Sequence, residues 1–209
     1  MVIEQVKEAA GKGTGIDVLF YPSSVAVIGA TPKAGHVGYV IMNNLLSKFK
    51  GKVILVNPRY DSINGVKCYK SITEVNDEVD LAVIAVPAPV VPQVTADAVK
   101  KGVKALIIIS GGFSEVGDEG KKLEDEVRKI VKDTQVRVLG PNCIGVYNSA
   151  NGLDTFFLPE DRMRRPHTGP IALLSQSGEV SAAIICLGCT TMLGSSVTRN
   201  DSTRVQVKD

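Results

Sequence analysis

A glycine-rich segment, residues 29–38 (GATPKAGHVG), follows a short apolar run and leads into a segment with helical spacing. Glycine lets a backbone approach a ligand closely, and the partner-free amides of a helix N-terminus bind anions, above all phosphate. The spacing is longer than the G-x-G-x-x-G fingerprint of dinucleotide-binding enzymes. The segment predicts a phosphate cradle, with a tight turn whose glycines serve only packing as the alternative. Its candidate binding residues are Gly29, Ala30, Thr31, Lys33, Gly35, His36, Val37 and Gly38.

A second candidate is Arg59, in the turn Asn57-Pro58-Arg59-Tyr60 that follows another apolar run. A site for NAD places an acidic residue here to bind the ribose hydroxyls. A guanidinium group instead suits a phosphorylated ribose, by its charge and by its bidentate geometry. Coenzyme A (CoA) carries a 3′-phosphate on its ribose and NADP carries a 2′-phosphate, so both ligands fit this residue. A surface arginine in a turn remains the alternative.

Further candidates follow the other apolar runs. Two prolines fix an extended backbone that could line a ring or a pantetheine arm, and adjacent glycines again allow close approach. A second anion site is predicted at a serine-rich helix start near the end of the chain. We find no convincing nucleophile–base pair, and therefore predict no catalytic residue. These further candidates are Val86, Pro87, Ala88, Ser110, Gly111, Gly112 and Asn142, and, for the second anion site, Ser175, Ser177 and Gly178.

Strands and helices alternate along the chain and position these turns. Strands of about five residues, most of them continuously apolar, are typical of a parallel sheet covered on both faces. The fold class is therefore predicted as α/β, a Rossmann-like doubly wound parallel sheet, whose ligands bind beyond the carboxyl ends of the strands. The predicted strands are 24–28, 52–56, 80–86, 104–109 and 135–139, and the predicted helices are 37–49, 90–101 and 118–132.

The domain organisation follows from where this alternation begins and ends. We expect a leader at residues 1–15, a Rossmann-like domain at 16–147 and a linker at 148–168. A new strand at 169–174 and a helix at 179–185 predict the start of a second α/β domain, incomplete at residue 209. Beyond residue 187 we expect a poorly ordered tail. The uncovered sheet edge favours self-association into a homo-oligomer.

Bulk properties narrow the function classes. A formal net charge of +2 with acids and bases interspersed predicts no nucleic-acid and no membrane partner. Four scattered cysteines fit a reducing, cytoplasmic location better than a disulfide scaffold. Cys186 and Cys189 form the only C-x-x-C pair, and we expect no metal site there because no histidine lies near them in sequence. No apolar run approaches the length of a membrane-spanning helix.

Six motifs in order along the chain carry a family resemblance: GATPKAGHVG, VNPRY, AVPAP, IISGGFSEVG, LGPNCIGVYN and IALLSQSGEVSAA. Together they resemble the α-subunit or N-terminal portion of NDP-forming acyl-CoA synthetases, the family of ADP-forming acetyl-CoA synthetase and succinyl-CoA synthetase. The resemblance runs from about residue 16 to residue 185. It implies that the domain binds CoA, with the phosphates at residues 29–38 and a basic contact at Arg59.

The resemblance also assigns roles to the remaining turns. Residues 86–88 would lie along the nucleotide or the pantetheine arm, and residues 110–112 would line the way to the thiol. Asn142 would lie near the site of acyl transfer. Ser177 and Gly178 resemble the start of a helix that stabilises the phosphate of the family's phosphohistidine.

The family reaction is acyl-CoA + ADP + Pi ⇌ acid + CoA + ATP, and here the sequence departs from the pattern. Its two histidines, His36 and His167, do not stand in the family's phosphocarrier segment, and the ATP-grasp portion is missing. We therefore expect a CoA- or acyl-CoA-binding protein that does not complete turnover alone. An intact enzyme assembled with a β-type ATP-grasp subunit, an NADP-binding oxidoreductase and a nucleotide-sensing regulator are the alternatives.

Overall fold

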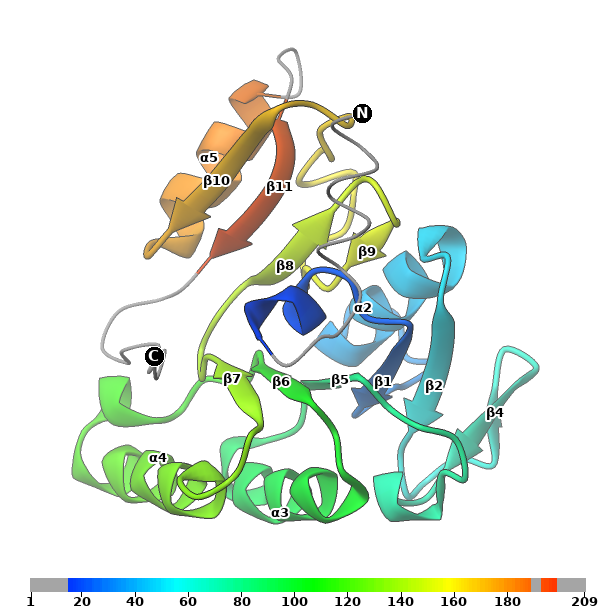
Figure 1. Ribbon diagram of the computed structural model, residues 1–209, viewed down its shortest axis with the longest axis vertical. Coiled ribbons are helices and arrows are strands. Elements are labelled where there is room, and N and C mark those ends of the chain that lie inside the picture. Colours follow the sequence, from blue (N-terminus) through cyan, green and yellow to red (C-terminus); the bar gives the residue numbers. More distant parts are fainter. Residues whose placement is uncertain (1–14, 189–192, 199–209) are drawn as a thin grey trace.

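The computed structural model describes residues 15–188 and 193–198 and contains two sheets (Figure 1). The larger sheet has seven strands, and all of its neighbouring pairs are parallel except one terminal hairpin. In sheet order the strands are β3 (Ser62–Ile63), β4 (Val66–Tyr69), β2 (Lys52–Val56), β1 (Ser24–Ile28), β5 (Leu81–Ile84), β6 (Ala105–Ile108) and β7 (Arg137–Leu139).

The parallel strands have the order that defines the Rossmann fold. Numbered along the chain without the hairpin strand β3, they run 3-2-1-4-5-6 across the sheet, with β1 and β5 at the centre. The chain order reverses between β1 and β5, and such a switch point opens a crevice above the carboxyl ends of the two strands. The predicted fold class, a Rossmann-like doubly wound α/β sheet, is confirmed.

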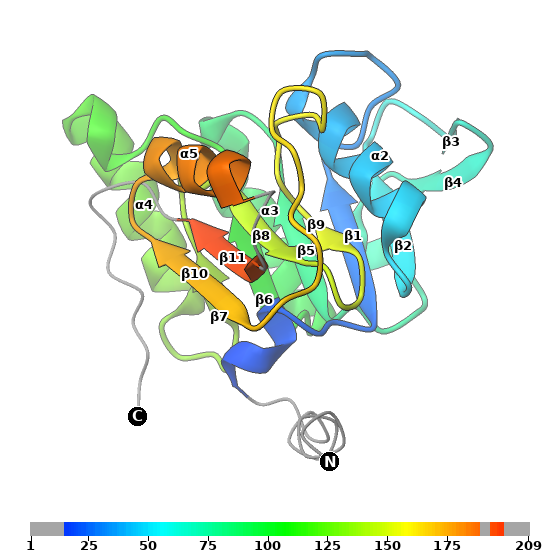
Figure 2. The same cartoon turned by 90° about the horizontal axis from the view of Figure 1, so that it is seen from above.

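Helices cover both faces of this sheet (Figures 1 and 2). Helix α2 (Val37–Lys48) and the 3-10 turn η1 (Ile16–Leu19) pack on one face, and α3 (Val91–Lys101) and α4 (Asp118–Val131) pack on the other. Strand β1 is fully enclosed because its alternate residues enter two different cores. Val25 and Val27 pack on the α2 side, and Ala26 and Ile28 pack on the α3 side.

Most of the predicted elements lie within a few residues of their observed bounds, but the β3–β4 hairpin was not predicted. Its turn is Asn64-Gly65, and both residues have positive φ, at 51° and 80°. This is the signature of a two-residue hairpin turn, so the sequence did contain the signal. The remaining short turns are η2 (Ile72–Glu74), η3 (Ala88–Val90) and η4 (Ser114–Val116).

The smaller sheet lies on the α2 side of the larger one (Figure 2). Its order is β10 (Ile171–Ser175), β11 (Leu193–Thr198), β8 (Gly145–Asn148) and β9 (Leu153–Asp154), and α5 (Gly178–Gly188) follows β10. Only β10 and β11 pair in parallel. Strand β10 corresponds to the predicted strand at 169–174, and α5 corresponds to the predicted helix at 179–185. The strands β8, β9 and β11 were not predicted.

The boundary predicted between residues 147 and 148 falls inside β8. Strand β8 is buried throughout because it pairs with β9 and β11, while Val146 packs in the core of the larger sheet. The predicted linker at 148–168 therefore supplies β9 and the last residue of β8. Residues 1–14 of the predicted leader and most of the tail beyond 188 lie outside the described residues. The domain boundaries themselves stay a prediction.

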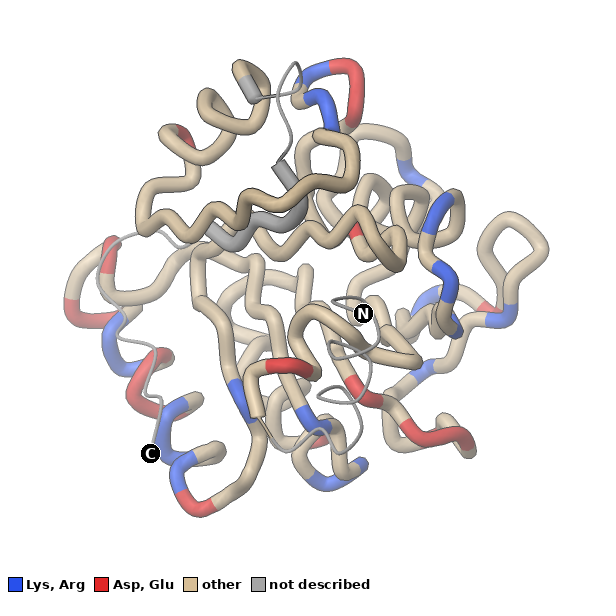
Figure 3. Tube along the Cα trace, turned by 45° about the horizontal axis from the view of Figure 1, so that its top comes forward, with Lys and Arg blue, Asp and Glu red and all other residues tan. Residues whose placement is uncertain are grey.

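Charged residues are mixed over the trace (Figure 3). Acidic and basic residues alternate along α4, while the α5–β10 unit is nearly free of them. Across the residues with described positions, no helix is long and apolar enough to cross a membrane.

Candidate functional site

A cavity of about 680 Å³ lies above the carboxyl ends of the central strands. This volume lies within the roughly 300–1,000 Å³ typical of ligand pockets. Its walls come from the turns that follow β1, β2, β5, β6 and β7, together with one residue from the segment after β9. The predicted residues that line it are Gly29, Thr31, Lys33, His36, Val37, Gly38, Asn57, Pro58, Arg59, Val86, Pro87, Ser110, Gly111 and Asn142.

Four candidates from the same turns do not line the cavity: Ala30, Gly35, Ala88 and Gly112. Ala30 is fully buried and acts through its backbone, because its carbonyl oxygen accepts a hydrogen bond from a neighbouring turn. Five lining residues were missed, namely Tyr60, Ala85, Val90, Ile109 and Phe157. Tyr60 lies in a predicted turn, and Ala85, Val90 and Ile109 lie at the ends of predicted strands or of a predicted helix, each within two residues of a candidate, so extending each set of candidates by one or two residues would have found them.

Close packing fixes the turn between β1 and α2. A Cβ atom on Gly29 would lie 2.3 Å from the carbonyl oxygen of Ala85, and one on Gly38 would lie 2.0 Å from that of Gly29. Both distances are far below van der Waals contact, so only glycine fits at either position. The first turn of α2 consequently rests directly on the end of β1 and faces the cavity.

The N-terminus of α2 presents backbone amides to this cavity. His36 is the N-cap, and its carbonyl oxygen accepts from the amides of Tyr39 and Val40 at 3.0 and 3.1 Å. The amides of Val37 and Gly38, which line the cavity, have no hydrogen-bond partner among the described residues. Two such donors at the positive end of a helix form a site suited to a phosphate oxygen.

Asn57 connects the β2 turn to the β1 turn. Its side-chain Nδ2 donates to the carbonyl oxygen of Ala30 at 2.8 Å, and its Oδ1 accepts from the amide of Arg59 at 2.9 Å. This local turn positions Arg59 at the cavity rim, where it is exposed. Neither Arg59 nor Lys33 forms an ion pair with any described residue. The rim therefore carries uncompensated positive charge.

The opposite end of the cavity is formed by the β6 and β7 turns. Ser110 donates from Oγ to the carbonyl oxygen of Val86 at 2.5 Å, and its own carbonyl oxygen accepts from the amide of Asn142 at 2.9 Å. A Cβ atom on Gly111 would lie 3.2 Å from Oδ1 of Asn142, so the two turns are in contact. Ile109, which follows β6, adds an apolar side chain to this end, and Phe157, from the segment after β9, also lines the cavity.

Cys143, beside this end, is a packing group. Burial raises the pKa of its thiol to about 12, and its Sγ donates to the carbonyl oxygen of Ile108 at 3.4 Å. A thiol with that pKa stays protonated at neutral pH and is a poor nucleophile. Within the described ranges, no three His, Cys, Asp or Glu side chains are grouped so that they could hold a metal ion.

The predicted second anion site lies on the β10–α5 unit, apart from the cavity lining. Ser177 accepts from the amide of Val180 at 3.3 Å and so caps α5, while Ser175 donates to the carbonyl oxygen of Ser177 at 3.1 Å. The Ser177 hydroxyl therefore caps the helix, and the Ser175 hydroxyl has a local hydrogen-bond partner. Phosphate binding by Ser175, Ser177 and Gly178 stays a prediction.

A sheet of this order, with free amides and cations gathered at its switch point, defines a nucleotide-binding protein of the Rossmann-like class. Residues 23–149 match the family model described as CoA binding domain, which covers more than half of the chain. The chain therefore belongs to this family of CoA-binding domains.

Known relatives point to one group of enzymes. The chain is 45% identical over 175 residues to an ADP-forming acetate–CoA ligase of Methanocaldococcus jannaschii, covering 84% of this chain and 24% of the relative. It is 46% identical over 175 residues to the alpha subunit of ADP-forming acetate–CoA ligase I of Pyrococcus furiosus, covering 81% and 37%.

Solved structures agree with these sequence relatives. An acetyl-coenzyme A synthetase of Ca. Korarchaeum cryptofilum, solved in complex with phosphate and ADP, superposes with a TM-score of 0.81 at 37% identity, covering 90% of this chain and 40% of that one. The chain thus spans between about a quarter and two fifths of the length of these relatives.

Proposed function

We propose that the cavity binds CoA, with the pyrophosphate at the N-terminus of α2 and the 3′-phosphate of the ribose at Arg59. The observation that carries this proposal is the pairing of free amides at Val37 and Gly38 with uncompensated cations at Lys33 and Arg59. Membership of the CoA-binding family supports CoA over NADP.

The cavity crosses the carboxyl ends of several neighbouring strands, so a long ligand such as CoA can lie across them. Neighbouring strands lie about 4.8 Å apart, so the three steps from β2 to β6 span roughly 14 Å. With the adenosine over the β2 turn, the pantetheine arm crosses Val86 and Pro87 and brings the thiol toward Ser110, Gly111 and Asn142. This orientation gives each predicted turn a separate part of the ligand.

Isothermal titration with CoA and dephospho-CoA tests this orientation. We expect Arg59→Ala to weaken CoA binding about tenfold or more, because a charge-assisted hydrogen bond contributes roughly 1.5–3 kcal/mol. Because dephospho-CoA lacks the 3′-phosphate, the same variant should bind it with an affinity reduced by less than about twofold. The matched control is Lys100→Ala, which removes an exposed cation on α3 outside the cavity. Equal losses for both ligands would contradict the contact between Arg59 and the 3′-phosphate.

NADP is the second candidate, because Arg59 also suits a 2′-phosphate. Thermal-shift titrations separate the two ligands. CoA should raise the unfolding temperature, and NADPH should neither raise it nor reduce the effect of CoA. A larger shift with NADPH would assign the cavity to an oxidoreductase or a nucleotide sensor.

We further propose that the chain is the CoA-binding part of an ADP-forming acyl-CoA synthetase and needs additional protein for turnover. One of the relatives is named as an alpha subunit, which supports a separate subunit as partner. Residues 169–209 would begin the second α/β domain, and β10, which is outermost in the smaller sheet among the described strands, would favour self-association. Incubation with acetyl-CoA, ADP and phosphate should yield no ATP from the chain alone. ATP formation by the purified chain would overturn this proposal.

A further inference from the structure

His36 is a basic residue in a position that helix stability does not explain. It is the N-cap of α2, with an extended backbone (φ −79°, ψ 146°), and its exposed side chain lines the cavity. Ser, Thr, Asp and Asn are preferred at this position because their side chains accept a hydrogen bond from a first-turn amide. The His36 side chain forms no such capping hydrogen bond. The positive end of a helix dipole moreover favours anions over cations.

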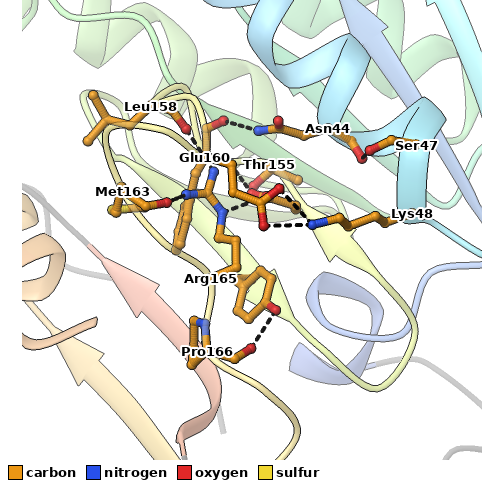
Figure 4. Close-up of polar contacts among 12 residues, drawn as sticks. Asn44, Ser47, Lys48, Thr155, Leu158, Glu160, Met163, Arg165 and Pro166 are labelled. Carbon is orange, nitrogen blue, oxygen red and sulfur yellow. Dashed lines mark hydrogen bonds and ion pairs between the residues drawn. The ribbon is translucent and has the colours of Figure 1, made fainter. Parts of the chain in front are cut away.

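Basic side chains at the two ends of α2 have different partners. At the C-terminal end, Nζ of Lys48 pairs with Glu160 at 2.7 Å (Figure 4). The same view shows Arg165, a buried cation that is also paired, Nε to Oδ2 of Asp154 at 2.6 Å. At the N-terminal end, His36 forms no ion pair with any described residue. A bound phosphate can supply the anion that this part of the chain does not.

The charge around His36 is positive. The titratable side chains that line the cavity with it are Lys33 from its own turn, and Arg59 and Tyr60 from the β2 turn. Within the described ranges, no Asp or Glu lines the cavity, and the β5, β6 and β7 turns contribute no titratable lining residue. Lysine and arginine stay charged at neutral pH, whereas histidine is the side chain that changes its charge between pH 5 and pH 8. Of these residue types, only histidine can make the charge of the cavity depend on pH near neutrality.

The position of His36 brings its side chain close to the predicted phosphate site. An N-cap side chain lies beside the amides of the first turn, which is why capping groups can reach them. In α2, the amides of Val37 and Gly38 line the cavity and have no hydrogen-bond partner among the described residues. A phosphate bound by these two amides is therefore within reach of the imidazole. Its negative charge favours the protonated ring, so binding of the phosphate and binding of the proton assist each other.

We propose that His36 is a proton-dependent ligand of the CoA pyrophosphate, so that CoA binds together with a proton and binds more tightly at pH 6 than at pH 8. This inference rests on the proposed function, in which the pyrophosphate lies at the N-terminus of α2. The proton comes from solvent and adds to the neutral imidazole, which becomes a cation and donates to a phosphate oxygen. CoA itself is not changed chemically.

The 3′-phosphate of CoA has a pH dependence of the opposite sign. A phosphate monoester takes up its second proton near pH 6 and thereby loses one negative charge. As the pH falls, this loss weakens the contact with Arg59, whereas protonation of His36 strengthens the contact with the pyrophosphate. Dephospho-CoA lacks the 3′-phosphate and therefore isolates the contribution of His36.

Titration calorimetry of the full chain with dephospho-CoA at pH 6, 7 and 8 tests the proposal. The wild-type chain should bind dephospho-CoA about tenfold more tightly at pH 6 than at pH 8, as expected for a hydrogen bond between charged groups. At pH 7 the measured heat should vary with the ionisation enthalpy of the buffer, because binding takes up protons. CoA should show a smaller rise in affinity between pH 8 and pH 6.

Two variants of His36 separate its charge from its size. His36→Gln keeps a polar side chain that cannot take up a proton, so its affinity for dephospho-CoA should be equal at pH 6 and pH 8. His36→Lys stays charged at all three pH values and should bind more tightly than His36→Gln, again without pH dependence. The control is His167→Gln, which removes the other histidine of the chain. His167 is exposed and does not line the cavity, so this variant should keep the pH dependence of the wild type.

The outcomes separate this inference from the proposed function. No saturable binding of CoA or dephospho-CoA by the wild-type chain at any of the three pH values would refute the proposed function itself. Equal wild-type affinities for dephospho-CoA at pH 6 and pH 8 would refute the inference alone. A pH dependence that persists in both His36→Gln and His36→Lys would also refute it, because another group would then take up the proton.

Discussion

Charged side chains lie at both ends of the strands of the seven-stranded sheet, which are called here the amino edge and the carboxyl edge. They form ion pairs at the amino edge, whereas Lys33 and Arg59 at the carboxyl edge do not pair with any described residue. At the amino edge, Asp80 accepts from Nζ of Lys104 at 2.7 Å and from the amide of Ser23 at 2.8 Å. At the carboxyl edge, Lys33 and Arg59 line a cavity and form no ion pair within the described part of the chain. The Asp80 carboxylate and the Lys104 ammonium are paired with each other, whereas the cations Lys33 and Arg59 at the ligand edge have no ion-pair partner among the described residues.

The pKa of Asp80 reflects this pairing. Burial is the largest single influence and opposes ionisation, but hydrogen bonds from Lys104, Ser23 and Ser24, together with the positive charge of Lys104, outweigh it. The pKa of Asp80 therefore lies below its usual value, and the pKa of Lys104 is raised mainly by its hydrogen bond to the same carboxylate. At the amino edge, the ionised form of Asp80 contributes to folding.

The largest expected effect comes from the close contact at the carboxyl edge. Gly38→Ala should lower the free energy of unfolding by about 3 kcal/mol or more, because the new methyl group would overlap a backbone carbonyl. At the amino edge, Gly102 ends α3 in the left-handed region with open space around it. Gly102→Ala should cost only about 1 kcal/mol. Urea denaturation of both variants measures the difference, and equal losses would mean that the carboxyl edge is not tightly packed.

The next effect concerns the paired charge at the amino edge. Asp80→Asn should lower the free energy of unfolding by about 1–2 kcal/mol at pH 7, since Lys104 is half exposed and part of its interaction is screened by solvent. CoA affinity, measured by titration calorimetry, should not change. A large loss of CoA affinity in the folded variant would contradict the separation between the two edges.

The pH dependence sharpens this assignment. The pKa of Asp80 is lower in the folded state than its value of roughly 3.9 in the unfolded state, so its contribution is present above that pH and is lost as the pH falls through the folded-state pKa. The stability difference between the wild type and Asp80→Asn should be constant from pH 7 to pH 5 and should become smaller as the pH falls toward 3. Urea titrations at the three pH values measure this difference. A difference that grows on acidification would mean that folding raises the pKa of Asp80 instead of lowering it.

The smallest effect on stability belongs to the free cation at the ligand edge. Arg59→Ala should change the free energy of unfolding by less than about 0.5 kcal/mol, because the side chain is exposed and has no ion-pair partner among the described residues. The same variant should show the loss of CoA affinity described above. A loss of stability as large as that of Asp80→Asn would show that Arg59 has a structural partner.

The sequence predicts the larger sheet well because its strands are apolar on both faces. The strands at Ser24–Ile28 and Lys52–Val56 coincide with the prediction, and the candidate turns all follow such strands. The β3–β4 hairpin was missed although Asn64-Gly65 gave the signal. The strands β8 and β9 lie among polar and turn-forming residues, so their pairing depends on tertiary contacts that local patterns do not encode.

Phe157 shows why part of the site could not be predicted from the sequence. Its neighbours in sequence give no strand or turn signal that points to the cavity. Its place depends on Asn44, which is more than a hundred residues away, and on the buried pair of Asp154 and Arg165. Arg165 itself lies in the predicted linker at 148–168, and the structure buries it. Its partner, Asp154, could not be identified from spacing alone.

Helix α2 connects the anion site at the cavity to a distant part of the molecule. Its twelve residues form a rod about 18 Å long, with its first turn beside the cavity. Its far end is fastened to another segment, since the amide of Lys50 donates to the carbonyl oxygen of Asn151 at 3.0 Å and Lys48 pairs with Glu160 at 2.7 Å. A phosphate bound at the first turn of α2 is therefore joined, through one helix, to Asn151 and Glu160 in the segments on either side of β9.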